Sequence, residues 1–463
     1  MLARSQPRTT PSIQEIHELF KRFVEEQDIR DVLQQSGKRF YERLYSPLVI
    51  LWCLVFQRLN AGHSCDEVVA HVNSGAVDHL NRHRRIPLSQ RVKSESTAAF
   101  CKARQRLPLA VAQSVARRLG QVGDEIDDQG LWLGHHVALL DGSTIRLNPQ
   151  TELVEKYGQS VNQHGKAYWV VMRIVAAFSL QTGALRDLQE GSMHDSEQSL
   201  STGVLKKLPV GTVCVADRNF GVFSVAQAAR HCELMVLFRL TASRARALSR
   251  RSACDGKSTK IAWHPSNYDH LDETMSSSPI GGRLLSLTVQ RDGFRSVHLD
   301  LFTTLMDEQR YTEEELVNLY GRRWDVELDL RYVKDTLDMA TLAGKSLDIV
   351  HKELWAGLAG YNLIRLVMLL ASQKAGLTPA DLSFTKCWRR ILQASFFLDR
   401  TGQSIALEDL LCQLARCRAQ KRERFRIEPR AVRRRPAVYP ALKGSRDEAR
   451  QLASQRIVCP KVA

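Results

Sequence analysis

The sequence has no Cys-x-x-Cys pair, no internal repeat and no long Gly/Ser linker among its 463 residues. Its ten cysteines are scattered along the chain. This pattern argues against a disulfide framework or a zinc ribbon and favours free thiols in a reducing compartment. The first residues also lack the apolar run of a secretory signal. We therefore expect a cytoplasmic protein.

A long apolar run without polar residues is also missing. The most apolar window, Leu354 to Ala371, is about long enough to span a bilayer but carries Asn362 and Arg365 in mid-segment. Polar and charged side chains are costly at the centre of a bilayer. The window therefore predicts a buried core helix, and no membrane partner is expected.

Acidic residues are fewer than basic ones, with 50 Asp and Glu against 66 Lys and Arg, so the net charge is +16. A cationic surplus favours a polyanionic partner, either nucleic acid or an acidic membrane. From Arg416 to Arg446 there are twelve Lys or Arg and only two Glu. Lys102, Arg104 and Arg106 lie on a predicted helix that ends at Pro108. These three cations either face phosphates or form a solvated helix face.

The hydrophobic pattern divides the chain into five regions. Helical periodicity over residues 1–130 predicts an all-α N-terminal domain. Residues 131–241 show the order β-β-β-α-β-α-β, and 242–304 predict a β-rich insertion. A long helix resumes the main pattern within 305–375, and 376–463 form a helical C-terminal region with a basic tail. The predicted fold class is α/β.

Two aspartates follow short apolar strands. Asp141 stands in Leu-Leu-Asp-Gly-Ser-Thr and Asp217 in Val-Ala-Asp-Arg-Asn-Phe. A carboxylate at the carboxyl end of a strand lies at the edge of a sheet, where α/β proteins place their sites. Taken singly, each aspartate is more often a turn or helix cap. The pair gains meaning only with a third member.

The helix predicted after residue 312 supplies a third carboxylate. At ~100° per residue, Tyr320, Arg323, Glu327 and Lys334 share one narrow stripe beside an apolar face. This stripe can lie at the edge of a sheet while the apolar face packs on it. Glu327 is therefore the preferred third carboxylate.

Two further acids on this helix, Asp325 and Asp329, are predicted to point away from the stripe into solvent. A simpler interpretation of the stripe itself stays open. Arg323 and Glu327 could be an ordinary surface pair of the i, i+4 type, worth only ~0.3–0.5 kcal/mol.

Three carboxylates from two strand ends and a helix suit hard divalent cations. Mg²⁺ prefers oxygen ligands and keeps coordination positions for phosphate and water. Two such ions ~3.5–4 Å apart can activate the attacking oxygen and stabilise the leaving oxygen of a phosphoryl transfer. A zinc enzyme is the weaker alternative, because no pair among His135, His136, His164 and His194 has the His-x-x-x-His spacing.

Together, the spacing Tyr320-(2)-Arg323-(3)-Glu327-(6)-Lys334, an earlier Asp141-Gly-Ser-Thr and an earlier Asp217-Arg-Asn-Phe resemble the DDE transposases of the insertion sequence four family. The resemblance covers about residues 95 to 370. It implies a ribonuclease H-like core interrupted by a β-rich insertion between the second Asp and the Glu. The expected function is that of an insertion-sequence transposase, which cleaves DNA at element ends and transfers the strand into target DNA.

The resemblance also implies roles for the matching residues. Asp141 would bridge two Mg²⁺ ions, with Mn²⁺ as a substitute, while Asp217 and Glu327 would each complete one site. The expected DNA-binding residues are Tyr320, Arg323 and Lys334, which would hold the backbone of the transposon end. The N-terminal helical domain is a further candidate for DNA binding.

The expected partners are the terminal inverted repeats, the target DNA and further copies of the chain, as a homo-oligomer in a synaptic complex. In relatives an aromatic side chain from the insertion stacks on a flipped base, and the candidates are Trp263 and Phe294. Asn219 departs from the family pattern, where a smaller residue is common. The alternative function is a catalytically inactive DNA-binding relative, acting as a repressor or domesticated protein.

Overall fold

A computed structural model describes the chain between residues 20 and 452, with gaps at 21–23, 25, 38–39, 41–43, 60–63, 81–85, 128–129, 163–164, 250–257, 268, 270–273, 290–296, 402–406, 420–444, 446 and 449–450. The chain divides into two units, residues 1–289 with 298–420 and residues 290–297 with 421–463. The elements below belong to the first unit, except for the first residue of one strand. Most of the basic tail lies outside the described residues.

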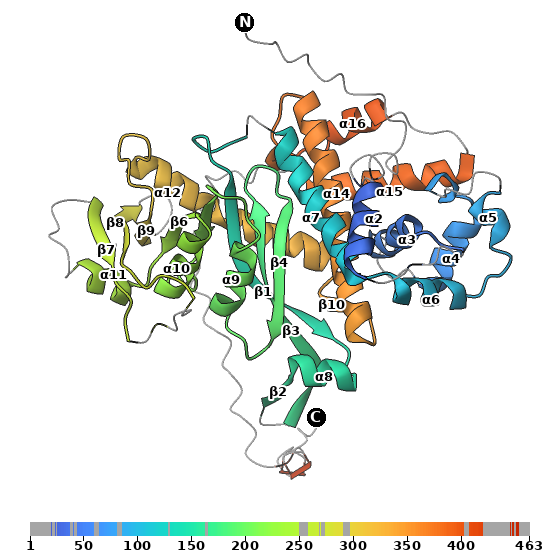
Figure 1. The fold of residues 1–463 in the computed structure, drawn as a ribbon, viewed down its shortest axis with the longest axis horizontal. Coiled ribbons are helices and arrows are strands. Elements are labelled where there is room, and N and C mark those ends of the chain that lie inside the picture. Colours follow the sequence, from blue (N-terminus) through green and yellow to red (C-terminus); the bar gives the residue numbers. More distant parts are fainter. Residues whose placement is uncertain are drawn as a thin grey trace, which may run out of the picture. The chain divides into compact units, whose positions relative to one another are not determined.

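All regular elements described before residue 127 are helices, as the periodicity predicts (Figure 1). Ser64 and Glu67 form a capping box that starts one of them, since each side chain accepts a hydrogen bond from the other's backbone N–H. Pro108 separates the last two, and Lys102 and Arg106 are exposed on the first of these. The helices are α2 (Glu26–Gln35), α3 (Pro47–Leu59), α4 (Cys65–Asn73), η1 (Asp78–Leu80), α5 (Leu88–Arg91), α6 (Ala98–Arg106) and α7 (Leu109–Ile126).

A mixed sheet follows, and most of its pairings are antiparallel. Its described strands are β1 (Val137–Leu147), β2 (Gln159–Asn162), β3 (Gly165–Ser179), β4 (Leu185–Ser192), β5 (Val213–Ala216), β6 (Met235–Arg239), β7 (Ser258–Trp263), β8 (Ile280–Val289), β9 (Val297–Thr303) and β10 (Thr341–Leu342). The order is β2-β3-β1-β5-β6-β9-β8-β7, with β4 beside β3 and β10 beside β1. β1 pairs parallel with β5 and antiparallel with β3, and β5 pairs parallel with β6.

The remaining helices alternate with these strands or follow them. They are α8 (Thr151–Tyr157), α9 (Glu197–Leu205), α10 (Phe223–His231), α11 (Ala242–Ser249), α12 (Glu313–Gly321), η2 (Arg322–Trp324), α13 (Asp325–Arg331), η3 (Tyr332–Thr336), α14 (Leu347–Lys374), η4 (Pro379–Asp381), α15 (Phe384–Thr401) and α16 (Leu407–Ala415). The series β1-β3-β4-α9-β5-α10-β6 has the predicted order. The sequence did not predict α8 and β2, which lie between its first two strands.

Both faces of the sheet are covered by helices. Successive side chains of β1 point to opposite faces, so Leu139 packs in one core cluster with residues of α7 and α14, and Leu140 in another with residues of α10. Helix α9 lies against β3 and β4 on the side of the second cluster. The candidate active site described below lies on the sheet between these two helical layers.

Helix α14 is the buried core helix predicted from the apolar window. It is long and apolar enough to cross a membrane, but 94% of its most apolar segment is buried inside the protein. Asn362 satisfies the edge of β4, because its amide accepts from the N–H of Leu185 at 2.7 Å and donates to the carbonyl of Leu185 at 2.9 Å. The same amide donates to the carbonyl of Ala116 on α7 at 2.8 Å. The polar residue that argued against a membrane span therefore joins two helices to the sheet.

Two sequence expectations about local structure are wrong. The strand with Asp141 does not end there but continues as β1 to Leu147, because its second half pairs with β3. The helix expected from Thr312 to Leu337 is divided into α12, the 3-10 turn η2, α13 and the π-helical turn η3. Single π turns inside helices are frequent at functional sites.

The predicted insertion is β-rich, with β7, β8 and β9 after helix α11. Its last strand, β9, pairs antiparallel with β6, so these strands extend the main sheet. Trp263 is buried at the end of β7 and packs edge-on against Phe223 and Phe302. A ring enclosed in this way cannot stack on a DNA base, so the interpretation of Trp263 as the stacking aromatic is wrong. Phe294 lies outside the described residues.

Candidate active site

Asp141 and Asp217 lie side by side at the end of the parallel pairing between β1 and β5. The last paired residues are Leu140 and Ala216, so each aspartate is the next residue along the chain, Asp141 within β1 and Asp217 just after β5. The two strands separate at this point, since β5 ends at Ala216 while β1 continues. Such a point of separation in a sheet is where α/β proteins form their sites.

Asp141 is held in an acidic, largely buried environment. Its Oδ1 accepts a hydrogen bond from the N–H of Gly142 at 2.8 Å. The pKa of Asp141 is raised to about 6, mainly by burial, and the nearby carboxylates of Asp217 and Glu327 add to the rise. The Gly142 N–H and the Arg323 guanidinium oppose it. The carboxylates of Asp217 and Glu327 therefore both lie close enough to Asp141 to repel it, an arrangement that favours a bound cation.

Arg323 lies between two of these carboxylates. Its guanidinium is 2.9 Å from Glu327 Oε1 and 3.8 Å from Asp141 Oδ2. The Arg323 side chain is only 8% exposed, whereas that of Glu327 is 40% exposed. The pair is therefore more than a surface i, i+4 contact, because its arginine is buried and faces a second acid. Trp324, which is exposed, lies 4.5 Å from the guanidinium carbon.

The other two residues of the stripe also face this edge. Tyr320 is buried, and burial raises its pKa, while the cations of Arg323 and Arg239 lower it and the Asp217 carboxylate raises it. Lys334 donates from Nζ to Ser143 Oγ at 3.0 Å, and Ser143 follows Asp141 by two residues on β1. All six residues selected from the sequence therefore come together around the point where β1 and β5 separate.

The donor set fits hard divalent cations by its chemistry, because it consists of carboxylate oxygens in a partly buried, negatively charged place. Within the described part of the chain, no three His, Cys, Asp or Glu residues already converge as metal ligands. Glu327 is held by Arg323, and its exposure leaves it room to reorient. The chemistry of these side chains thus fits a centre for divalent metal ions.

Sequence reasoning missed four neighbours of the site. Arg239 ends β6 beside Tyr320, and Trp324 is the exposed aromatic next to Arg323. Glu197, in the first turn of α9, accepts a hydrogen bond from Asn219 Nδ2 at 2.5 Å. Asn219 carried a signal, as a departure from the family pattern, and Trp324 directly follows Arg323 in the sequence, a neighbourhood typical of the family. Arg239 and Glu197 come from elements whose approach depends on the sheet order.

The expectation that Asp329 points into solvent is wrong. Asp329 is buried and pairs with Arg365 of α14, and Tyr361 Oη donates to it at 3.0 Å. Helix α13 packs on the sheet on one side and near α14 on the other, so a single apolar face could not predict its burial. The Asp325 side chain is 40% exposed, in keeping with the expectation, and pairs with Arg322 at 2.7 Å.

The alternative zinc site finds no support among the described residues. His135 contacts Tyr311 Oη at 2.7 Å, and His136 lies 3.7 Å from Asp124. His194 is exposed, and His164 lies outside the described residues. The eight described cysteines are free.

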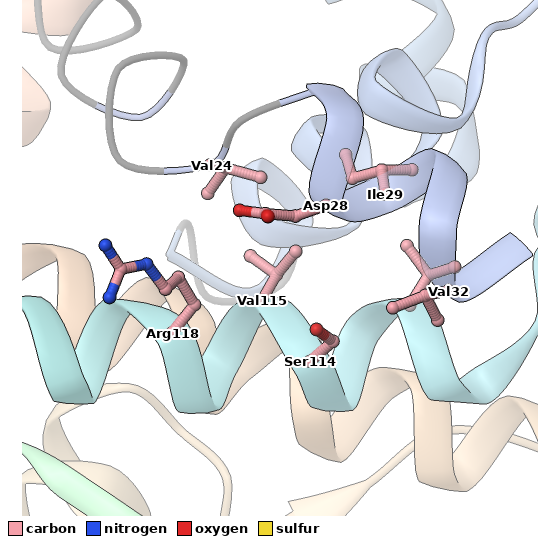
Figure 2. Close-up of a pocket in the computed structure, with 8 residues that line it drawn as sticks. Val24, Asp28, Ile29, Val32, Ser114, Val115 and Arg118 are labelled. Atoms are coloured by element: carbon pink, nitrogen blue, oxygen red, sulfur yellow. The ribbon is translucent and has the colours of Figure 1, made fainter.

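A small pocket between α2 and α7 contains none of the selected residues. Its lining is mostly aliphatic, with one acid and one arginine at its rim, as Figure 2 shows for Val24, Asp28, Ile29, Val32, Ser114, Val115 and Arg118. The candidate active-site residues lie where β1 and β5 separate, outside this pocket.

A family model described as the transposase DDE domain matches residues 132–363, half of the chain. The chain belongs to this transposase family. The matched region runs from just before β1 into α14 and contains all six selected residues. The resemblance expected from the sequence is confirmed at the level of the family.

Among curated proteins, the chain is similar to transposase InsG for insertion sequence element IS4 of Escherichia coli, with 24% identity over 90% of this chain and 92% of that protein. A 95-residue segment, 20% of this chain, is 34% identical to 24% of the "Probable transposase for insertion sequence element IS5377" of Geobacillus stearothermophilus. Among solved structures, a piggyBac transposase synaptic complex with hairpin DNA matches with 11% identity and a TM-score of 0.40, over 98% of this chain and 92% of that one. A score this low does not indicate a shared fold.

Proposed function

We propose that the protein is an insertion-sequence transposase that cleaves DNA at the ends of its element and transfers the strand into target DNA. The observation that carries the proposal is the meeting of Asp141, Asp217 and Glu327 at one sheet edge, within the region that matches the transposase DDE domain. The long match to the IS4 transposase supports the same element family.

We further propose that the core is ribonuclease H-like. The support is the strand order β4-β3-β1-β5-β6, in which β3 is antiparallel to its neighbours and β5 and β6 are parallel to β1. Residues 131–241 and 305–375 would form this core, and 242–304 its insertion. Residues 1–130 would form a DNA-binding helical domain and 376–463 a basic C-terminal region.

In this proposal each selected residue has one task. Asp141, Asp217 and Glu327 would together hold two Mg²⁺ ions. When bound, such ions supply activation of the attacking oxygen and stabilisation of the leaving oxygen in phosphoryl transfer. Glu327 would leave Arg323 to hold a metal ion.

The cations of the stripe would hold the DNA backbone. Arg323, released from Glu327, can donate two hydrogen bonds to one phosphate, and its burial fixes where that phosphate lies. Lys334 would add a point charge from the side of Ser143. Tyr320 would donate its hydroxyl from beside Asp217.

The partners follow from this reaction. They are the terminal inverted repeats, the target DNA and further copies of the chain in a synaptic complex in the cytoplasm. The exposed Lys102 and Arg106 on α6 and the basic tail are the candidates for additional phosphate contacts, which would make the affinity fall with salt.

The test is cleavage of DNA that carries the element ends, with Mg²⁺ or Mn²⁺, by the wild-type protein and by Asp217→Asn. We expect the substitution to abolish nicking without weakening DNA binding, because Asn keeps the shape of the side chain but not its charge. Asp325→Asn, on the exposed side of α13, is the matched control and should cut normally. Undiminished cutting by Asp217→Asn would refute the proposed site. Tight end binding by the wild type without a nick in either metal would favour the inactive DNA-binding relative.

A further inference from the structure

The loop that follows β5 carries both Asp217 and Asn219. Four hydrogen bonds made by the exposed residue Asn219 hold this loop in place. Asn219 donates its backbone N–H to Asp217 Oδ1 at 2.8 Å and its Nδ2 to Glu197 Oε2 at 2.5 Å. Its carbonyl and its Oδ1 both accept from Gln198 Nε2, at 2.8 and 3.1 Å. All four polar groups of Asn219 are therefore bonded, although the residue is exposed.

Glu197 and Gln198 come from a rigid support. They form the start of α9, whose N-cap Ser196 accepts a hydrogen bond from the N–H of Ser199 at 3.0 Å. Helix α9 packs on β3 and β4. The position of its first turn is therefore set by the sheet and does not depend on the loop that it contacts.

The Glu197 carboxylate also lies directly against the chain after Asp141. A β-carbon on Gly142 would collide with this carboxylate, so the glycine leaves the space that Glu197 occupies. Glu197 thus contacts the residue after one catalytic aspartate and, through Asn219, the loop of the other. This places it where it can fix the two aspartates relative to each other.

The contact also determines which oxygen of Asp217 is available. Oδ1 is committed to the backbone of Asn219, and within the described residues Oδ2 has no hydrogen-bond partner. A carboxylate with one oxygen fixed presents the other in a defined direction. Residues that orient a metal ligand in this way typically contribute 10–100-fold to metal affinity or activity, by the general behaviour of outer-shell contacts.

We propose that Glu197 and Asn219 form a positioning pair that orients Asp217 for metal binding. The pair acts through Asp217 and does not itself hold the ion, and the inference rests on the proposed function. It assigns a role to Asn219, the residue that departs from the family pattern. The backbone carbonyl of residue 219 contacts Gln198 of α9 whatever the side chain, but only the Asn219 side chain reaches Glu197.

The test compares Asn219→Ala, Glu197→Ala and Glu197→Gln with wild type. Mn²⁺ binding to the protein on its end DNA is followed by electron paramagnetic resonance, and nicking is measured against Mg²⁺ concentration. We expect both alanine variants to need about 10–100-fold more metal. Glu197→Gln should recover most of this loss, because the Gln carbonyl still accepts from Asn219 Nδ2. The double alanine variant should be no worse than either single one, since both remove the same contact.

The control is Glu314→Ala, which removes an exposed acid from the first turn of α12 and should change neither readout. Equal losses in Glu197→Gln and Glu197→Ala would overturn the inference, because the charge of Glu197 would then matter directly. Wild-type metal dependence in Asn219→Ala would overturn it as well. The Asp217→Asn variant distinguishes a failure of this inference from a failure of the proposed function. If it is inactive while the pair variants are normal, only the inference fails, and if it cuts normally, the proposed function fails.

Discussion

Two acid–arginine pairs start from neighbouring positions of one short helix and differ in almost every physical respect. Glu327 pairs with Arg323, and its side chain is 40% exposed. Asp329 pairs with Arg365, and both side chains are only 7% exposed. The ring centroids of Tyr332, Tyr361 and Phe384 lie 5.1–5.4 Å from the Arg365 guanidinium carbon. Burial raises the pKa of Asp329 to about 6, although Arg365 lowers it.

The difference shows how one helix can be fixed by a buried ion pair and still carry a second acid, Glu327, that is free to change partner. In the first pair only Glu327 is partly exposed, whereas Arg323 is 8% exposed and also lies 3.8 Å from Asp141. Glu327 can therefore leave its arginine for another cation without leaving Arg323 far from every carboxylate. Breaking a buried pair by removing one partner costs about 3–5 kcal/mol, since it leaves an uncompensated charge. The Asp329–Arg365 pair therefore holds α13 on α14, and the Glu327–Arg323 pair remains exchangeable.

The largest expected effect is on the buried pair. Arg365→Met should lower the free energy of unfolding by about 3–5 kcal/mol, because Asp329 then has no cation in an aromatic environment. Denaturant unfolding measures this. The double variant with Asp329→Leu should regain most of the stability, since it removes both charges. If Arg365→Met unfolds like the wild type, the buried pair does not fix the helix.

The second effect concerns activity alone. Glu327→Gln should reduce strand cleavage by about 10²–10³-fold, the usual size of the loss when one electrostatic group of a reaction centre is removed. The free energy of unfolding should change by less than about 1 kcal/mol, because Glu327 is 40% exposed and Arg323 still lies beside the Asp141 carboxylate. Cleavage rate and denaturant unfolding are measured on the same preparation. A loss of stability as large as that of Arg365→Met would contradict the distinction between the two pairs.

The smallest expected effect concerns a third ion pair on the same segment, which is more exposed than the other two. Arg322 and Asp325 form a third pair on this segment, 2.7 Å apart, with side chains 45% and 40% exposed. Arg322→Ala should change the free energy of unfolding by less than about 0.5 kcal/mol and leave cleavage unchanged. A clear loss of cleavage in this variant would extend the reaction centre to the outer face of the helix.

Much of the site was predictable because short-range patterns encode it. The apolar run before Asp217 forms β5, and that aspartate follows the strand as expected. The spacing of the stripe survives the division of the long helix, because Arg323 still reaches Glu327 and Lys334 still reaches the strand of Asp141. Such regularities depend on backbone geometry, which the sequence expresses directly.

The wrong expectations share a cause, which is contact with a distant segment. Asp141 was placed at a strand end, but pairing with β3 carries β1 on to Leu147. Asp329 was placed in solvent, but α14 covers it. Trp263 was a candidate for base stacking, but Phe223 and Phe302 enclose it. The hydrophobic pattern of one helix or strand cannot show that a distant segment of the chain will pack against a second side of it.

The sequence by itself determined the family, the three carboxylates and the excess of positive charge, because each is a matter of residue type and local spacing. Only the tertiary structure decided that Glu327 is partly exposed and can change its partner, and that Asp329 is fixed in a buried ion pair. The free energy of an ion pair depends on its removal from water, and that removal is produced by segments far away in the chain. The same holds for Glu197, which lies beside Gly142 only because the sheet brings α9 there.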